Sequence, residues 1–186
     1  MPGQIFRFDP PTRFVAGTVG EPGQRTFFLQ ARDDQRLTSV ALEKDQVSAL
    51  VERIDALLDE VVRRTGGSAS IPAITPAEVE DLDPLEEPIV EEFRVGTLTL
   101  TWDSDDELIV IEAYAQTEGD DEPPDDPENS DREVLLVRIS GTVARTFVKR
   151  ATAVVEAGRP PCPLCSLPLD PEGHICPRQN GYRRRL

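Results

Sequence analysis

The chain has 186 residues, of which 38 % are hydrophobic, so it can form one ordinary domain with or without a small appendage, and fibrous, collagenous and fully disordered classes are excluded. Its 35 acidic and 20 basic residues leave a net charge of −15, which argues against a body that binds nucleic acids or anionic membranes in general. No segment approaches the roughly 18 to 20 consecutive apolar residues of a membrane helix, and residues 1–6 lack the basic and then apolar pattern of a secretory signal, so we expect a soluble, cytoplasmic protein.

The first third of the chain predicts three strands followed by a helix. Apolar alternation between turn signals places the strands at 13–19, 24–31 and 37–42. One face of their antiparallel sheet would carry Phe27, Leu29, Val40 and Leu42. The apolar period then changes to that of an amphipathic helix over 45–65, with Asp45 as its cap and Gly66-Gly67 as its end. We expect this helix to cover the sheet.

A connector rich in proline and acidic residues follows at 67–92, and we expect a solvated loop or a short helix there. Strand signals return at 93–102, 107–116 and 133–139, and the acidic turn between the first two predicts a hairpin. A second helix is expected over 141–157, capped by Ser140. Its apolar stripe would consist of Val143, Phe147, Ala151 and Val154.

Between the last two strands, residues 118–131 contain eight acidic residues, three prolines and no basic residue. Such a composition cannot bury enough apolar surface to fold, so we expect a disordered, solvating insertion. The run also lacks the regular alternation and central glycine of a calcium loop, which disfavours metal binding there.

The two halves resemble each other weakly. Phe14-Val15-Ala16-Gly17-Thr18 recurs as Phe93-Arg94-Val95-Gly96-Thr97, and each copy begins a run of three strands that ends in an amphipathic helix. We predict an α+β fold, a mainly antiparallel sheet with two helices on one face. The halves are either duplicated βββα units or alike by chance, since the shared motif fixes only three residues.

All three cysteines and the only histidine fall within 15 residues near the C-terminus, at Cys162, Cys165, His174 and Cys176. Three cysteines cannot pair off, so a reduced, metal-liganding set is favoured over a disulfide framework. Three thiolates and one imidazole match four-coordinate structural zinc, and the spacing Cys-x2-Cys is that of a zinc knuckle. An iron–sulfur ligand set, redox thiols and free structural cysteines are the alternatives.

Charge is divided unevenly, because residues 1–158 carry −18 and residues 159–186 carry +3. We therefore divide the chain into an α+β body, 1–158, and a zinc-binding basic tail, 159–186. The tail offers groups that can bind a phosphorylated ligand, a short nucleic-acid stretch or an acidic partner, namely Arg178, Asn180, Tyr182, Arg183, Arg184 and Arg185. The alternative is that these arginines fold back on the acidic surface of the body.

Known catalytic patterns are absent from the sequence: there is no glycine-rich phosphate loop, no HExxH helix and no Ser–His–Asp set that spares the only histidine. Four ligands would also fill the coordination shell of the metal, so catalysis there is not expected. An enzyme would need carboxylates alone or an acquired cofactor, and we lean towards a protein without catalytic activity.

The tail reads Cys-Pro-x-Cys, Gly-His-x-Cys-Pro-Arg and Asn-Gly-Tyr-Arg-Arg between Cys162 and Arg184. On these residues the sequence resembles a family of actinobacterial conserved-hypothetical proteins of unknown function, and the resemblance extends through 93–112 and the helix after Ser140. It implies a cytoplasmic protein whose partners are a histidine-phosphatase-like and a phosphatidylinositol-kinase-like protein. Such a group of proteins would handle a phosphorylated compound.

These features together favour a non-catalytic, zinc-containing binding or adaptor protein whose basic tail contacts a phosphorylated ligand or an acidic partner. An enzyme that acts on a phosphorylated small molecule is the first alternative, with Arg178, Arg183 and Arg184 holding the phosphate. An RNA-contacting zinc knuckle is the second.

Overall fold

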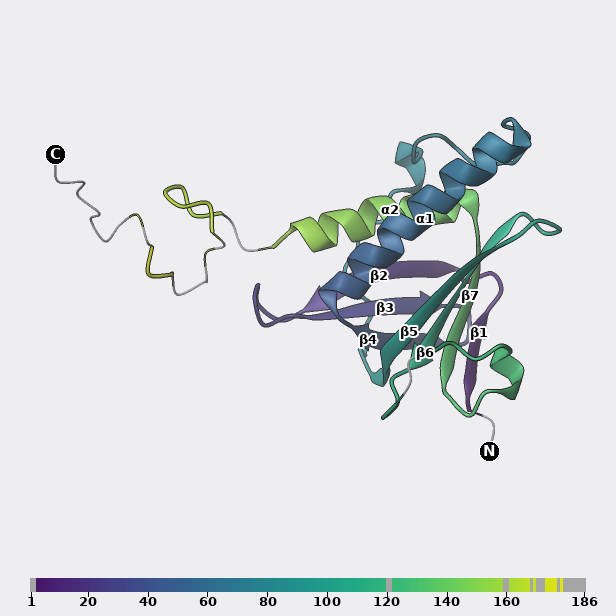
Figure 1. The fold of residues 1–186 in the computed structure, drawn as a ribbon, viewed down its shortest axis with the longest axis horizontal. Helices are drawn as coiled ribbons and strands as arrows, with labels where there is room; N and C mark the ends of the chain where they lie inside the picture. Colours follow the sequence, from purple (N-terminus) through teal and green to yellow (C-terminus); the bar gives the residue numbers. More distant parts are fainter. Residues whose placement is uncertain are drawn as a thin grey trace.

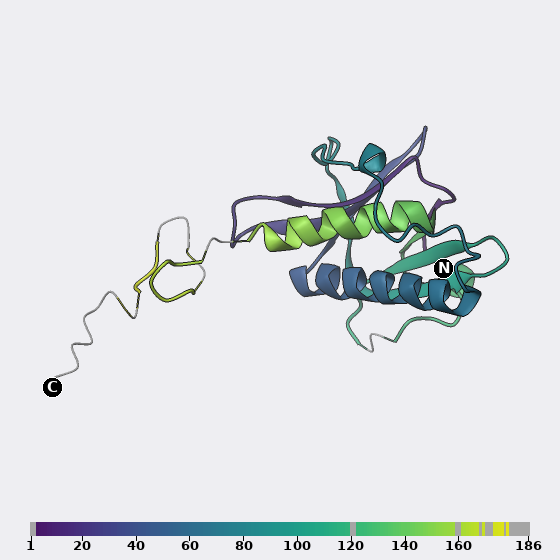
Figure 2. The same ribbon diagram turned by 90° about the horizontal axis from the view of Figure 1, so that it is seen from above.

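The computed structural model describes residues 3–119, 122–158, 161–167, 169, 173–176 and 178. In this part of the chain seven strands form one mixed sheet, and two α-helices lie side by side on one of its faces (Figure 1 and Figure 2). The elements are β1 (Ile5–Phe8), β2 (Arg13–Val19), β3 (Thr26–Arg32), β4 (Leu37–Leu42), α1 (Lys44–Thr65), β5 (Glu91–Asp103), β6 (Leu108–Ala115), β7 (Val134–Ser140) and α2 (Gly141–Glu156). The predicted α+β class, with two helices on one face, is confirmed.

The sheet has the strand order β1-β7-β6-β5-β4-β3-β2. Four neighbouring pairs are antiparallel, as predicted, whereas β4 pairs with β5 and β1 pairs with β7 in parallel. The element order β2-β3-β4-α1 is repeated as β5-β6-β7-α2, and the parallel pairing of β4 with β5 joins the two halves into one sheet. This repetition supports the proposed duplication. Strand β1 lies outside both halves, and its four residues are too few for a period to predict it as a strand of its own.

Helix α1 begins at Lys44, and its cap is Glu43 rather than Asp45, so the prediction for Asp45 is wrong. The Gln46 side chain accepts a hydrogen bond of 2.8 Å from the backbone N–H of Glu43, as in a capping box. Asp45 instead lies in the first turn, where its negative charge interacts favourably with the helix dipole. The helix ends at Gly66, which has a φ of +61°, as predicted. Among the described residues, no helix combines the length and apolar character needed to cross a bilayer.

The hydrophobic core lies between the sheet and the two helices. All four residues predicted for the core face of the first strands are buried there. Helix α2 contributes Phe147, whose ring stacks on that of Phe14 in β2 with 4.7 Å between the ring centroids. Ser140 caps this helix as predicted, by accepting a hydrogen bond of 3.3 Å from the Val143 N–H.

One residue of the predicted stripe on α2 does not belong to the core. Phe147 and Ala151 are buried and Val154 packs against the core, but Val143 is 39 % exposed. Its place is taken by Ala144, which is fully buried. Periodicity alone does not distinguish neighbouring positions at the edge of a helix face.

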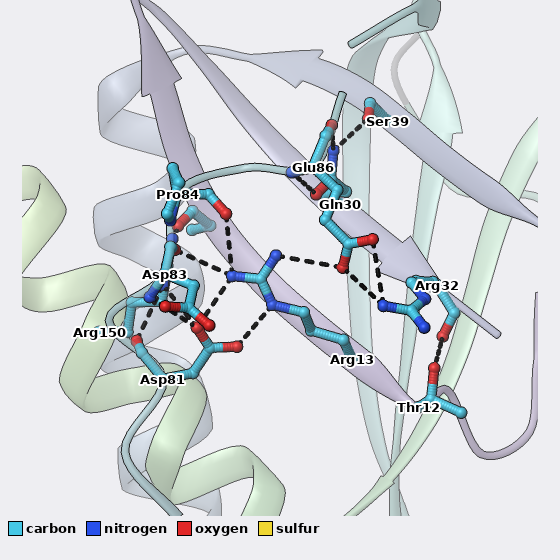
Figure 3. Close-up of polar contacts among 11 residues, drawn as sticks. Thr12, Arg13, Gln30, Arg32, Ser39, Asp81, Asp83, Pro84, Glu86 and Arg150 are labelled. Carbon is cyan, nitrogen blue, oxygen red and sulfur yellow. Dashed lines mark hydrogen bonds and ion pairs between the residues drawn. The ribbon is translucent and has the colours of Figure 1, made fainter. Parts of the chain in front are cut away.

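The connector is more than a solvated loop. It contains a short 3-10 helix at Ala77–Val79, and residues 81–86, here called the strap, then pack against β2 and β3 (Figure 3). Gln30 of β3, which is 2 % exposed, donates a hydrogen bond of 3.0 Å to the carbonyl of Glu86 and accepts one of 2.8 Å from its N–H. A β-carbon on Gly17 would lie 2.5 Å from Leu85 Cγ, so glycine is what allows the strap to approach β2.

Asp81 fixes one end of the strap between two arginines (Figure 3). Its carboxylate accepts hydrogen bonds from Arg13 of β2 at 2.6 and 2.9 Å and from Arg150 of α2 at 3.0 Å. Arg150 also donates at 2.9 Å to the carbonyl of Ala16, on the edge strand of the sheet. The hydrogen bonds from Arg13 hold the pKa of Asp81 below its ordinary value. One carboxylate thus ties the strap, the edge strand and α2 together.

The acidic run makes contacts that the sequence did not predict. In its described residues, a 3-10 helix at Pro127–Asn129 places Glu128 in an ion pair with Arg7 of β1. Ser130 is buried, and its carbonyl accepts a hydrogen bond of 2.9 Å from the N–H of Gly3. Asp120 and Asp121 lie outside the described residues. The disorder expected for 118–131 as a whole stays a prediction.

Replacing Asp81 with alanine is expected to lower the free energy of unfolding by about 2 to 4 kcal/mol, because it leaves Arg13 and Arg150 without their shared carboxylate. The pKa of Asp81 is lowered in the folded chain from an ordinary value of 3.8, so its ion pairs stabilise the fold fully above that pH. Their contribution is lost as the pH falls through the lowered pKa. Urea unfolding of both proteins, at pH 7 and at a series of acidic pH values, should show a difference that shrinks below about pH 4.

Glu60→Ala is the matched control, because it removes ion pairs with Arg63 and Arg64 on the exposed face of α1. Surface ion pairs contribute little to stability, so we expect the free energy of unfolding to fall by less than about 1 kcal/mol. Equal losses in the two variants would contradict the role given to Asp81.

Candidate metal centre

Four side chains with sulfur or nitrogen donor atoms come together in the tail, and they are the four that the spacing predicted. Their ligand atoms all lie within 4.8 Å of one another, in the group Cys162, Cys165, His174 and Cys176. In both views the described part of the tail lies beyond the end of α2 and away from the sheet (Figure 1 and Figure 2). The hydrogen bonds found among the described residues of the tail all stay within it.

The first two cysteines lie in a tight turn. The N–H of Ser166 donates to the carbonyl of Cys162 at 2.8 Å, and the N–H of Cys162 donates to the carbonyl of Leu167 at 2.8 Å. The N–H of Leu164 points at the Cys162 Sγ from 3.4 Å. These bonds curl the backbone so that the two sulfur atoms face the same side, where His174 and Cys176 approach them.

The distances between donor atoms fit a single four-coordinate ion. The Sγ atoms of Cys162 and Cys176 are 3.9 Å apart, and the Sγ of Cys165 lies 3.2 Å from Nε2 of His174. A tetrahedron with metal–sulfur bonds of about 2.3 Å places its sulfur atoms about 3.8 Å apart. All three cysteines are free of disulfides. The group can therefore hold one metal ion.

Local electrostatics differ between the two cysteines of the turn. Backbone N–H groups of Cys165 and Leu164 donate to the sulfur of Cys162 and lower the pKa of that thiol. Burial raises the pKa of the Cys165 thiol, because it disfavours the thiolate. A positive ion among the sulfur atoms would favour the thiolate form of both, and the thiolate is the form that ligates metals.

His174 offers Nε2 to the centre, since this nitrogen faces the Cys165 sulfur. Its other ring nitrogen, Nδ1, is buried and finds no hydrogen-bond partner among the described residues. Histidines that ligate metals usually donate this second N–H to a carbonyl or a carboxylate. The orientation of the ring therefore assigns Nε2 as the ligand atom and leaves Nδ1 for such a contact.

Of the residues predicted to bind a phosphorylated ligand or a partner, the structure describes Arg178. Its guanidinium donates a hydrogen bond of 2.9 Å to the carbonyl of Leu164, so it fastens the last ligand segment to the cysteine turn. The other predicted contact residues lie outside the described part of the chain, namely Asn180, Tyr182, Arg183, Arg184 and Arg185.

The structure also brings Arg25, Lys44 and Arg94 to one pocket at the start of α1. The sequence did not single out this group, because its members come from three distant segments and no spacing connects them.

Gly173 precedes the histidine ligand with a φ of +85°, in a region that side-chain-bearing residues rarely adopt. Gly173→Ala is expected to weaken metal binding by about 5- to 30-fold, because a β-carbon in this conformation costs about 1 to 2 kcal/mol. Titration with Co²⁺, whose thiolate complexes absorb visible light, measures the affinity. Ser166 has a φ of +61°, so Ser166→Gly is the matched control and should bind at least as tightly as the natural chain. Unchanged affinity in Gly173→Ala would contradict the geometry of this segment.

Comparison with protein families finds a match over most of the chain. The model of a family described as "Protein of unknown function (DUF3090)" matches residues 6–176. The matched range includes both helices of the body and all four metal-ligand candidates. No curated protein and no solved structure matches the chain significantly. Because the family model covers most of its length, the chain belongs to the DUF3090 family of proteins of unknown function.

Proposed function

We propose that the chain is a non-catalytic, zinc-containing binding or adaptor protein, in which the metal orders a basic tail that contacts a phosphorylated ligand or an acidic partner. The observation that carries this proposal is the convergence of four donor atoms within 4.8 Å. Three sulfur atoms and one imidazole nitrogen are the donors of structural zinc sites, whereas calcium and magnesium prefer oxygen.

The same donor set favours a structural role over a catalytic one. A catalytic zinc has three protein ligands and an open position for water or substrate, whereas the four donor atoms here are enough to complete a tetrahedral shell. No aspartate or glutamate joins the group in the described part of the tail. A metal held in this way stabilises a local fold and leaves the contact with other molecules to the residues around it.

The surroundings of the centre suit a contact surface. The tail carries a charge of +3 against −18 for the body, and its arginines can bind phosphate or carboxylate groups through paired hydrogen bonds. Next to the ligands, Leu164, Leu167 and Ile175 are 48 %, 51 % and 84 % exposed. Exposed aliphatic side chains beside basic ones favour a protein partner with an acidic rim.

The proposal also includes a cellular compartment and two partner proteins. Three free thiols suit the reducing cytoplasm, where disulfides are rare. The partners that the resemblance implies are a histidine-phosphatase-like protein and a phosphatidylinositol-kinase-like protein.

Elemental analysis of the full chain, purified without chelator and without a histidine tag, tests the identity of the metal. We expect about one zinc per chain and no iron, since the four ligands build one tetrahedral site. Cys165→Ser should lose most of this zinc while the body stays folded, as judged by circular dichroism and urea unfolding. Leu164→Ala is the matched control, because it changes the neighbouring residue, keeps all four ligands and should retain the metal.

Two results would overturn the zinc assignment. One is a natural chain that holds no zinc, and the other is a Cys165→Ser variant whose zinc content equals that of the natural chain. Iron in place of zinc would instead assign the ligand set to an iron–sulfur centre.

A further inference from the structure

A pocket of about 690 Å³ lies in the body where β3 and α1 begin and α2 ends. Its apolar lining includes Phe27, Leu42 and Val155, and its polar lining includes the cations Arg25, Lys44 and Arg94. Glu43 and Glu156 lie at the same pocket. Gly158, the last residue before the tail, also lines the pocket.

Two of these cations are unpaired, which is unusual in so acidic a body. Most arginines of the body form ion pairs, and several of them contact more than one carboxylate. Within the described body, the cations whose charged groups make neither an ion pair nor a hydrogen bond are Arg25, Lys44 and Arg53. Arg25 and Lys44 belong to the same pocket, and the Arg25 guanidinium lies over the Phe27 ring at 5.2 Å.

The acidic residues of the pocket do not neutralise the positive charges of Arg25 and Lys44. Glu43 is held by Arg94, whose guanidinium lies 2.8 Å from its carboxylate, so each of these two charges compensates the other. Glu156 is the remaining acid, against two unpaired cations. The pocket also receives the start of α1 at Lys44, near the positive end of the helix dipole, where the Glu43 side chain caps the Gln46 N–H.

We propose that this pocket binds a phosphate-bearing small molecule, with Arg25 and Lys44 contacting the phosphate group. A phosphate dianion matches two cations better than a single carboxylate does, because it carries two charges and can accept a hydrogen bond from each cation. The apolar lining can take the uncharged part of the ligand, and Glu156 can accept hydrogen bonds from its hydroxyl groups. All residues that line the pocket precede the tail, so this proposal goes beyond the zinc-containing tail and does not depend on it.

The test is a titration of the full, metal-loaded chain with inorganic phosphate, and then with glycerol 3-phosphate, at constant ionic strength. Amide chemical shifts of residues 25–27 and 43–46 report the pocket, and glycerol is the uncharged comparison. We expect saturable shifts with both phosphates and none with glycerol. Arg25→Gln and Lys44→Gln should each weaken binding by about ten-fold or more, because each removes a charge-assisted hydrogen bond.

Arg53→Gln is the matched control. It removes the third unpaired cation and changes the net charge equally, but Arg53 lines a neighbouring pocket with residues 96–100 of β5. Its affinity for phosphate should stay within about two-fold of that of the natural chain, because a screened charge outside the pocket contributes little. Equal weakening by Arg53→Gln would show unspecific charge attraction and overturn the proposal.

Treatment with a chelator distinguishes phosphate binding by the pocket from phosphate binding by the tail. Removing the metal with a chelator should leave the phosphate shifts of the pocket unchanged, whatever the metal analysis of the tail shows. Loss of phosphate binding upon chelation would assign it to the tail and overturn the pocket. Shifts that fail to saturate in the natural chain would overturn it as well.

Discussion

Ion pairs formed by arginines offset the repulsion among the many carboxylates of this body. In residues 1–158, carboxylates outnumber cations by more than two to one, and such repulsion opposes a compact state. The arginines lie where several acidic groups from distant segments meet. Arg138 of β7 contacts Asp9, Asp103 and Asp106, and Arg145 of α2 contacts Asp55 and Asp59 of α1. Arg13 and Arg150 hold the strap through Asp81. Each of these arginines offsets the repulsion between carboxylates where two elements meet. A surface ion pair within one helix, in contrast, would contribute little to stability.

Local patterns predicted the parts of the fold that depend on neighbours in sequence. The strands follow from apolar alternation, because one face of the sheet is buried under both helices. The end of α1 follows from Gly66, since few other residues tolerate its backbone conformation. The metal-ligand group also follows from spacing, because Cys-x2-Cys forms a turn by its own hydrogen bonds and does not need the rest of the fold. The identity of the ion does not follow from spacing, and it depends on chemistry that elemental analysis measures.

The remaining features depend on contacts between segments far apart in sequence, and no period or spacing encodes those. The parallel pairing of β4 with β5 links strands separated by α1 and the whole connector. Gln30 reads as an ordinary polar residue of a strand, yet it is buried because the strap brings the Glu86 backbone to it. Asp81 is one acid among many in the connector, and only the fold shows that two arginines share it. The pocket of Arg25 and Lys44 has the same origin, since β3, α1 and α2 meet there.

The two proposed sites consist of different residues. The described hydrogen bonds of the tail stay within it, so a metal bound there would order a local segment. The pocket, in contrast, is built by the body and ends at Gly158, where the tail leaves. Charges in water are screened within a Debye length of about 8 Å, and in both views the described part of the tail lies away from the sheet (Figure 1 and Figure 2). A metal in the tail and a phosphate in the pocket are therefore expected to bind independently, each through its own ligands.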